Sequence, residues 1–242
     1  MTQELRVGNL ASTLKHTARH WEEHRKSQHS SAKPNALTIA LARETGTSGT
    51  AIAHEVGKQT GWPVYDHELV ELIAKDMGLE ERLLDSVDEK KVTWLQEAFG
   101  TFLAVPIVSE SAYVKHLIKI ILALGALGNC VIVGRGSAFI LPAASTLRVR
   151  LTGPRDERID AVAQRFAISR REAEARMTQI DREQEQFIRD HFLKDPAVPY
   201  SYDLVLNVGR FSPVRCAAII VESAHQMEAQ FRRTNARPAT ES

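Results

Sequence analysis

The sequence of 242 residues has little cysteine, few aromatic side chains and no long apolar run. Its two cysteines, Cys130 and Cys216, both lie in apolar stretches, so a disulfide framework is excluded and we expect free thiols in a reducing compartment. The most apolar stretch, 117–133, contains Lys119 and two glycines and falls short of the roughly 20 apolar residues of a membrane span. The first residues lack the cationic start and apolar core of a signal peptide. We therefore expect a cytoplasmic protein that does not bind membranes.

The chain also lacks an excess of either charge, because 31 lysines and arginines face 30 acids. A formal net charge of +1 argues against a protein that coats nucleic acid, and the strands show no interleaved aromatic residues of the kind that bind single strands. We therefore expect no nucleic-acid partner. Lysine is absent from 135–189, where eleven arginines and eight acids occur.

Apolar runs and helical spacing alternate along the chain. Apolar, partly β-branched runs predict strands over 37–42, 63–65, 130–133, 147–151 and 203–206. Helical spacing predicts helices over 51–60, 67–77, 91–103, 111–127, 155–166, 169–192 and 213–231. Strands that alternate with helices and lack a polar face predict an α/β fold, with a parallel sheet covered by helices on both faces.

Three regions are expected from the composition. Residues 1–35 form a helical extension and linker, because a polar helix over 4–29 is followed by a stretch rich in serine, proline and asparagine. Residues 36–228 form the α/β domain, and 229–242 form a flexible tail.

A loop of small residues follows the first predicted strand and runs into a helix. Such a loop offers several backbone N–H groups to an anion, and the residues expected to bind phosphate are Gly46, Thr47, Ser48, Gly49 and Thr50. The Thr50 hydroxyl could also reach a magnesium ion. The usual phosphate-loop pattern has a lysine where this chain has Gly49, and Arg43 could supply the missing positive charge. A plain tight turn is the alternative interpretation of the loop.

Six segments in register carry a resemblance to a known family. They are ALARETGTSGTAIAHEVG at 40–57, WPVYDHELVELIA at 62–74, GNCVIVGRGSAFIL at 128–141, LRVRLTGPRDERI at 147–159, ISRREAEARMTQIDREQEQF at 168–187 and YDLVLNVGRF at 202–211. Together they resemble the cytidylate-kinase-like family of the P-loop fold. The resemblance implies a P-loop NTPase-like sheet with helical monophosphate-binding and lid segments. It also implies phosphoryl transfer from ATP to a nucleoside monophosphate, CMP or dCMP first, with Mg²⁺.

The resemblance also implies roles for individual residues. Arg135 matches the arginine that binds the acceptor phosphate, and it could otherwise cap a strand edge. Asp66 matches an aspartate of the monophosphate pocket and can at the same time be the N-cap of the following helix. Arg158 and Arg165 match arginines that lead into the lid and are expected to bind substrate, with solvated ion pairs as the alternative.

The expected catalytic residues are Arg43, Arg135, Asp181 and Arg182. Asp181 matches the lid aspartate, but the lid arginine expected three residues later is Gln184. Arg182 or Arg176 could replace it, although Arg182 points about 100° away from Asp181 around the helix axis. An arginine on the transferring phosphoryl group can be worth roughly 10³–10⁵ in rate. A nucleotide-binding sensor or interaction protein with a degenerate loop is therefore the alternative function.

The N-terminal extension carries two further patterns. His20 to His24 matches H-x-x-E-H, the pattern of a zinc-peptidase variant, and His16 extends the row along one helical face. We expect no zinc catalysis there, because the segment lies outside the predicted core. Leu5, Leu10 and Leu14 give the helix a narrow apolar strip, which could pack on the domain or on a second subunit in a homodimer.

Overall fold

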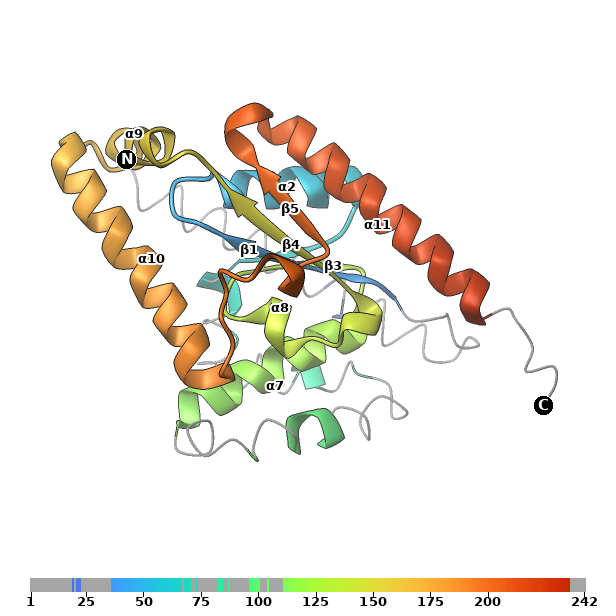
Figure 1. Cartoon of the computed structure of the whole chain (residues 1–242). Coiled ribbons are helices and arrows are strands. Elements are labelled where there is room, and N and C mark those ends of the chain that lie inside the picture. Colours follow the sequence, from blue (N-terminus) through green and yellow to red (C-terminus); the bar gives the residue numbers. More distant parts are fainter. Residues whose placement is uncertain are drawn as a thin grey trace.

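Five parallel strands form the sheet that the structure describes, in the order β2-β3-β1-β4-β5 (Figure 1). The strands are β1 (Thr38–Arg43), β2 (Val64–Tyr65), β3 (Cys130–Val133), β4 (Thr146–Thr152) and β5 (Leu204–Asn207). All four neighbouring pairs are parallel. The predicted strands and the predicted α/β class are therefore confirmed.

The computed structural model describes residues 19, 21–22, 36–66, 68–70, 73, 82–84, 87, 96–100, 104 and 111–235. The helices with bounds are α2 (Gly49–Thr60), α7 (Ala112–Leu127), α8 (Ser137–Ile140), α9 (Arg155–Phe166), α10 (Arg170–Phe192) and α11 (Pro213–Asn235). Short 3-10 turns cover 143–145, 199–201 and 208–210. Most of the helices predicted over 4–29, 67–77 and 91–103 lies outside the described residues.

Helices cover both faces of the sheet. Helices α2 and α11 lie on one face, and α7 and α8 lie on the other (Figure 1). The alternation of side chains along a strand explains this, because Ile39 and Leu41 of β1 join the core under α2 and α11, whereas Ala40 joins the core under α7. Both clusters consist mainly of buried aliphatic side chains, which is what a doubly covered parallel sheet requires.

Local sequence sets the ends of several helices. Ser169 accepts the N–H of Glu172 and Glu172 accepts the N–H of Ser169, a capping box that starts α10 one residue after the predicted start. Gly61, with φ 74°, ends α2 in the left-handed conformation. Helix α11 continues to Asn235, beyond residue 228, where the sequence placed the end of the domain.

The parallel arrangement brings distant segments to one edge of the sheet. The carboxyl ends of the strands lead into Glu44 after β1, Asp66 after β2, Gly134 after β3, Gly153 after β4 and Val208 after β5. Because ligands of open α/β sheets bind outside these ends, this edge is where a functional site is expected. Among the described helices, none is long and apolar enough to cross a membrane.

Candidate functional site

The loop between β1 and α2 closes through its own backbone and one hydroxyl. The N–H of Thr47 donates to the Glu44 carbonyl at 3.4 Å, and the Thr47 hydroxyl donates to the same oxygen at 2.7 Å. Both Thr47 donors are thus used inside the loop, and the expectation that Thr47 binds phosphate stays a prediction. Ser48 is exposed, takes a left-handed φ of 53° and makes no side-chain cap on α2. Helix α2 also has no acidic residue in its first turn.

Gly46 is required by a close approach of backbones. A methyl group on Gly46 would lie 2.5 Å from the Arg158 carbonyl oxygen in α9, and the φ of +88° is one that few other residues adopt. The loop therefore packs directly on the helix that leads into the predicted lid. The free N-terminal end of α2 carries the positive end of the helix dipole toward the same edge.

Arg43 occupies the space that a lysine side chain at position 49 would need. A methyl group on Gly49 would meet Cβ, Cγ and Cδ of Arg43 at 2.9–3.1 Å, so the arginine stem lies across that glycine. The other end of the side chain reaches β3, because Nη1 lies 2.9 Å from where a methyl group on Gly134 would be. Arg43 therefore spans from the loop toward the end of the neighbouring strand.

Charges of both signs surround the Arg43 guanidinium. Burial lowers the pKa of Arg43, Arg135 lowers it further, and Arg165 acts in the same direction. Asp66 and Asp181 raise it but do not outweigh the lowering. Four other site residues predicted from the sequence thus act electrostatically on the Arg43 guanidinium. Arg135 and Arg165 each repel the Arg43 guanidinium, and a bound anion would relieve that repulsion.

A turn of three left-handed residues presents Arg135. Gly134, Arg135 and Gly136 have φ values of 75°, 52° and 74°, between β3 and α8. A methyl group on Gly136 would lie 2.3 Å from Cε2 of Phe192, at the end of α10, which is a second reason for glycine at that position. A non-glycine residue in this conformation costs roughly 1–2 kcal/mol, and such strain is often found at functional sites.

Asp66 starts the segment after β2. Its Oδ1 accepts the N–H of Leu69 at 3.0 Å, and its carbonyl accepts the N–H of Val70 at 3.0 Å. The predicted N-cap is therefore confirmed. The same carboxylate acts on Arg43, so capping and a place in the candidate site are compatible, as the sequence predicted.

Arg158 and Asp181 join the loop to the two lid-side helices. The Arg158 Nε donates to the Thr45 carbonyl at 2.8 Å, and its guanidinium pairs with Glu44 at 3.1 Å and with Asp181. The other Asp181 oxygen accepts the N–H of Thr45 at 2.8 Å. With 10% of its side chain exposed, Arg158 has three partners from the protein itself instead of the solvated ion pairs expected as the alternative.

Glu44 is a site residue that the sequence analysis missed. Its carboxylate pairs with Arg158 at 3.1 Å and with Arg150 at 3.2 Å, and accepts the N–H of Gly153 at 3.4 Å. It therefore ties the loop to β4 and α9. The only local signal was an acid placed directly after a buried strand, in the RETG segment.

Two other lid-side arginines contact an aromatic ring instead of Glu44 or Asp181. Arg176 stacks on Phe166 with its guanidinium carbon 3.9 Å from the ring centroid, and Arg165 lies 5.4 Å from the same ring. Arg182 is exposed on α10, and Gln184 is partly buried. Arg182 is not among the charged groups that act on Arg43. Its expected catalytic role stays a prediction.

A pocket opens on the other side of the loop, toward β4 and β5. Its volume is about 190 Å³. It is lined by residues of the loop, of α2, of α9 and of the segments after β4 and β5, and these include Ile52, Glu157, Arg158, Val208 and Phe211. The loop thus lies between a mainly apolar pocket on one side and the arginine cluster on the other. Among the described residues, no three or more His, Cys, Asp and Glu side chains are grouped to hold a metal ion, and His16, His20 and His24 lie outside them.

The strand order and the loop between β1 and α2 define an α/β protein with a nucleotide-kinase-like fold. The model of the cytidylate kinase-like family matches residues 38–210, and the chain therefore belongs to that family. This membership supports nucleotide binding and kinase-like chemistry in general.

Two of the solved structures that match the chain differ in their similarity to it, and the first resembles it in fold. An uncharacterized protein from Eubacterium ventriosum ATCC 27560 has a TM-score of 0.64 at 19% identity, over 78% of this chain and 98% of that one. The protein TT1252 from Thermus thermophilus has a TM-score of 0.42 at 19% identity, over 80% of this chain and 98% of that one. Likeness at this identity concerns the fold alone. No curated protein matches the chain.

Proposed function

We propose that this protein is a nucleoside monophosphate kinase that transfers the γ-phosphoryl group of ATP to CMP or dCMP. The observation that carries the proposal is the position of the Arg43 side chain, which lies across Gly49 of the loop, reaches Gly134 beside Arg135 and is repelled by Arg135 and Arg165, next to an uncapped helix. Like charges held together in a folded protein indicate an anionic ligand, and arginine forms bidentate hydrogen bonds with phosphate. CMP comes first because of the family to which the chain belongs.

The donor nucleotide fits the side of the loop that faces β4 and β5. The apolar walls at Ile52, Val208 and Phe211 suit a planar base, and the loop lies next to them. The phosphates would then lie along the backbone of Gly46, Ser48 and Gly49, at the start of α2. This orientation directs the γ-phosphate toward Arg43.

Magnesium fits this site as an ion carried by the nucleotide. Thr50, in the first turn of α2, offers a hydroxyl, and the described residues provide no carboxylate cage that would hold the ion alone. Mg²⁺ bound through phosphate oxygens, with few protein ligands, is the usual arrangement in such sites. When bound, the ion neutralises phosphate charge and orients the phosphates.

The acceptor fits the side of the loop that faces β2 and β3. Arg135 would hold its phosphate, Asp66 borders the same space, and Arg43 lies between acceptor and donor. An acceptor phosphate oxygen attacks the γ-phosphorus while the bond to the β–γ bridging oxygen breaks, so that ADP leaves and a nucleoside diphosphate forms. Catalysis of this kind rests on positioning and charge neutralisation, which three arginines can supply.

A nucleotide-binding protein without turnover is the second candidate function. It is favoured by the state of the lid-side residues: Arg158 and Asp181 bind each other and the loop, Arg176 stacks on Phe166, and Arg182 is exposed. In this arrangement none of these lid arginines takes the place of the arginine expected at position 184, where this chain has Gln184.

The decisive experiment incubates the purified full chain with ATP, Mg²⁺ and a panel of nucleoside monophosphates and follows ADP formation, beside nucleotide-induced shifts in Tm. The kinase proposal expects ADP formation that depends on the monophosphate and is highest with CMP or dCMP. Binding of ATP without ADP formation would support the second candidate and refute the first.

Two variants test the site assignment. Arg135→Ala should raise the KM for CMP about tenfold or more and change the KM for ATP less than twofold, because its charge lies on the acceptor side. Arg171→Ala removes an exposed arginine at the start of α10 and should change neither. An equal increase of both KM values in Arg135→Ala would contradict the assignment.

A further inference from the structure

Trp21 lies outside the part of the chain that matches the family, residues 38–210, but is buried in the core. Its side chain is 3% exposed, and its indole Nε1 donates to the Tyr65 hydroxyl at 3.1 Å. The two residues are 44 positions apart, and Tyr65 is fully buried. A hydrogen bond between two buried aromatic side chains makes a tryptophan of the N-terminal segment part of the domain core.

Tyr65 is the last residue of β2, directly before Asp66. Its neighbour across the sheet is Ile132 of β3, the strand that leads to Arg135. Asp66 in turn caps the following segment and acts on the charge of Arg43. Tyr65, whose hydroxyl accepts the hydrogen bond from Trp21, is therefore the residue directly before Asp66, the carboxylate on the proposed acceptor side.

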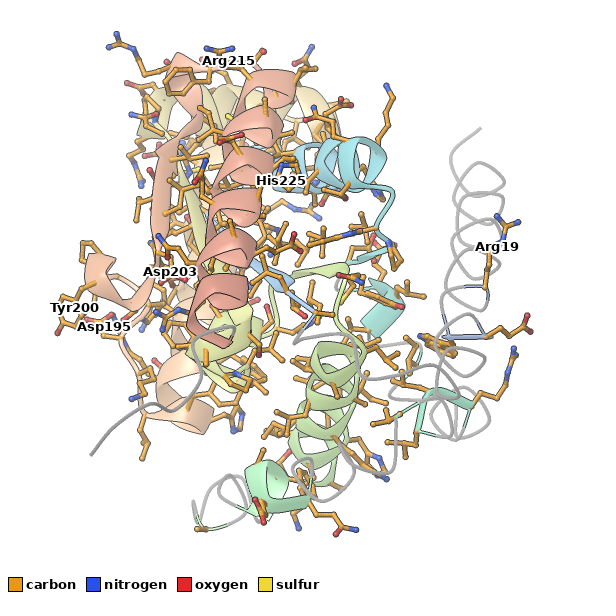
Figure 2. The ribbon with its side chains drawn as sticks, turned by 90° about the vertical axis from the view of Figure 1, so that its right-hand side faces the viewer. Arg19, Asp195, Tyr200, Asp203, Arg215 and His225 are labelled. Atoms are coloured by element: carbon orange, nitrogen blue, oxygen red, sulfur yellow. The ribbon has the colours of Figure 1, made fainter. Side chains whose placement is uncertain are left out.

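The indole also belongs to the buried cluster that contains residues of the segment after Asp66. Trp21, Leu69, Val70 and Ile73 belong to the same buried cluster, under α7. In Figure 2, Arg19 lies on the opposite side of the molecule from Asp195 and Tyr200, which belong to the segment leading to β5. This agrees with a position of Trp21 at the β2 edge of the sheet, since β2 and β5 are the two edge strands.

We propose that Trp21 is a positioning residue for the acceptor side of the site. The indole fixes Tyr65 through the hydrogen bond and fixes the start of the next segment through apolar contact, and both effects set the place of Asp66. A shift of Asp66 would disturb acceptor binding and leave the donor pocket unchanged, because that pocket is built from the loop and from the residues after β4 and β5. The proposal rests on the proposed kinase function, with CMP as acceptor.

The kinetic test compares Trp21→Phe and Tyr65→Phe in the full chain, since each removes the hydrogen bond and keeps an aromatic ring. Each should raise the KM for CMP about five- to tenfold and change kcat and the KM for ATP less than twofold. The double variant should lose less than the sum of the two single effects, because both single variants remove the same bond. The matched control is Trp62→Phe, which changes a partly buried tryptophan that packs in the cluster on the other face of the sheet and should leave both KM values unchanged.

A binding measurement separates this proposal from the function on which it rests. Calorimetry of CMP binding to the wild type and to Trp21→Phe should show a five- to tenfold loss of affinity in the variant. In a Trp62→Phe/Trp94→Phe protein, which keeps Trp21 as its only tryptophan, CMP should change the fluorescence and ATP should not.

The outcomes distinguish the two claims. An active wild type with unchanged CMP affinity in Trp21→Phe, or with CMP and ATP affinities lowered equally, overturns the role of Trp21 and leaves the kinase intact. A wild type that neither binds nor phosphorylates CMP overturns both.

Discussion

Replacement of Arg43 by methionine should make the protein more stable and much less active. Methionine keeps an unbranched stem across Gly49 and removes the charge. Burial and Arg135 lower the pKa of Arg43, so the folded state holds this proton less tightly than the unfolded chain does. Arginine remains protonated at every pH at which the protein would be assayed, so the full cost of the buried charge is present at pH 7 and does not change between about pH 5 and 9.

The expected gain in stability is about 1 kcal/mol, the size of an ordinary single substitution, and would raise Tm by roughly 2–4 °C for a chain of this length. The expected loss of kcat is about 10³-fold, at the lower end of what an arginine on a transferring phosphoryl group contributes. Arg43→Lys should lie between the two proteins, because lysine keeps a charge but lacks the planar fork of a guanidinium. Scanning calorimetry gives Tm, and coupled ADP release with ATP, Mg²⁺ and CMP gives kcat.

A relocated charge tests whether Arg43 replaces the absent loop lysine. Gly49→Lys alone should be destabilising, because its Cβ would lie 2.9 Å from Cδ of Arg43. Together with Arg43→Ala, which shortens that stem, the lysine should recover at least tenfold of the activity that Arg43→Ala loses. The reasoning is refuted if Arg43→Met keeps the wild-type kcat, or if it lowers Tm and kcat together, since the latter would mark a structural role.

Three more predictions concern stability. Asp181→Asn should lower the free energy of thermal unfolding by about 1–3 kcal/mol, because it removes one of the two anionic partners of the buried Arg158. The control Asp160→Asn loses an exposed ion pair with Arg170 and should lower it by less than about 1 kcal/mol. Equal losses in the two variants would contradict a stabilising buried ion pair between Arg158 and Asp181. Ser48→Gly should raise Tm by about 1–3 °C, because glycine adopts the left-handed φ of 53° without the strain of a side chain. Ser48→Ala should not raise Tm, because alanine keeps that strain. A Tm lowered by glycine would show that the serine side chain stabilises the loop. Burial raises the pKa of the Cys130 thiol from 9.0 to about 12, so the folded protein keeps a proton that the unfolded chain loses above pH 9.0, and this residue should lower the free energy of unfolding by roughly 1.4 kcal/mol per pH unit in that window. Cys130→Ala should reduce that slope in denaturant titrations at pH 9–10, and an unchanged slope would assign it to other groups.

Much of the fold could be predicted because its signals are local. The strands at 38–43 and 130–133 are short apolar runs, and the capping box at Ser169 lies within four residues. The loop after β1 was also visible, since two glycines and small hydroxyl residues follow a buried strand. Each of these patterns repeats or ends within a few residues and depends little on the rest of the molecule.

Individual site roles were harder to predict because they depend on distant partners. Arg158 and Arg165 lie on one helix and have the same residue type, but Arg158 is buried against Glu44 and Asp181 whereas Arg165 acts on Arg43. Nothing within a helical turn of these two arginines distinguishes their outcomes, because their partners come from other elements.

The sequence by itself determined the parallel α/β sheet, the loop that offers backbone N–H groups, and the arginines available to bind phosphate. The tertiary structure decided which of these arginines meet, that Arg43 lies across Gly49, and that Trp21 joins the core through Tyr65. The physical reason is the distance along the chain between the residues that interact. Backbone pairing and burial periodicity are set by neighbours along the chain, whereas charge neighbourhoods and buried hydrogen bonds join residues that only the folded sheet brings together.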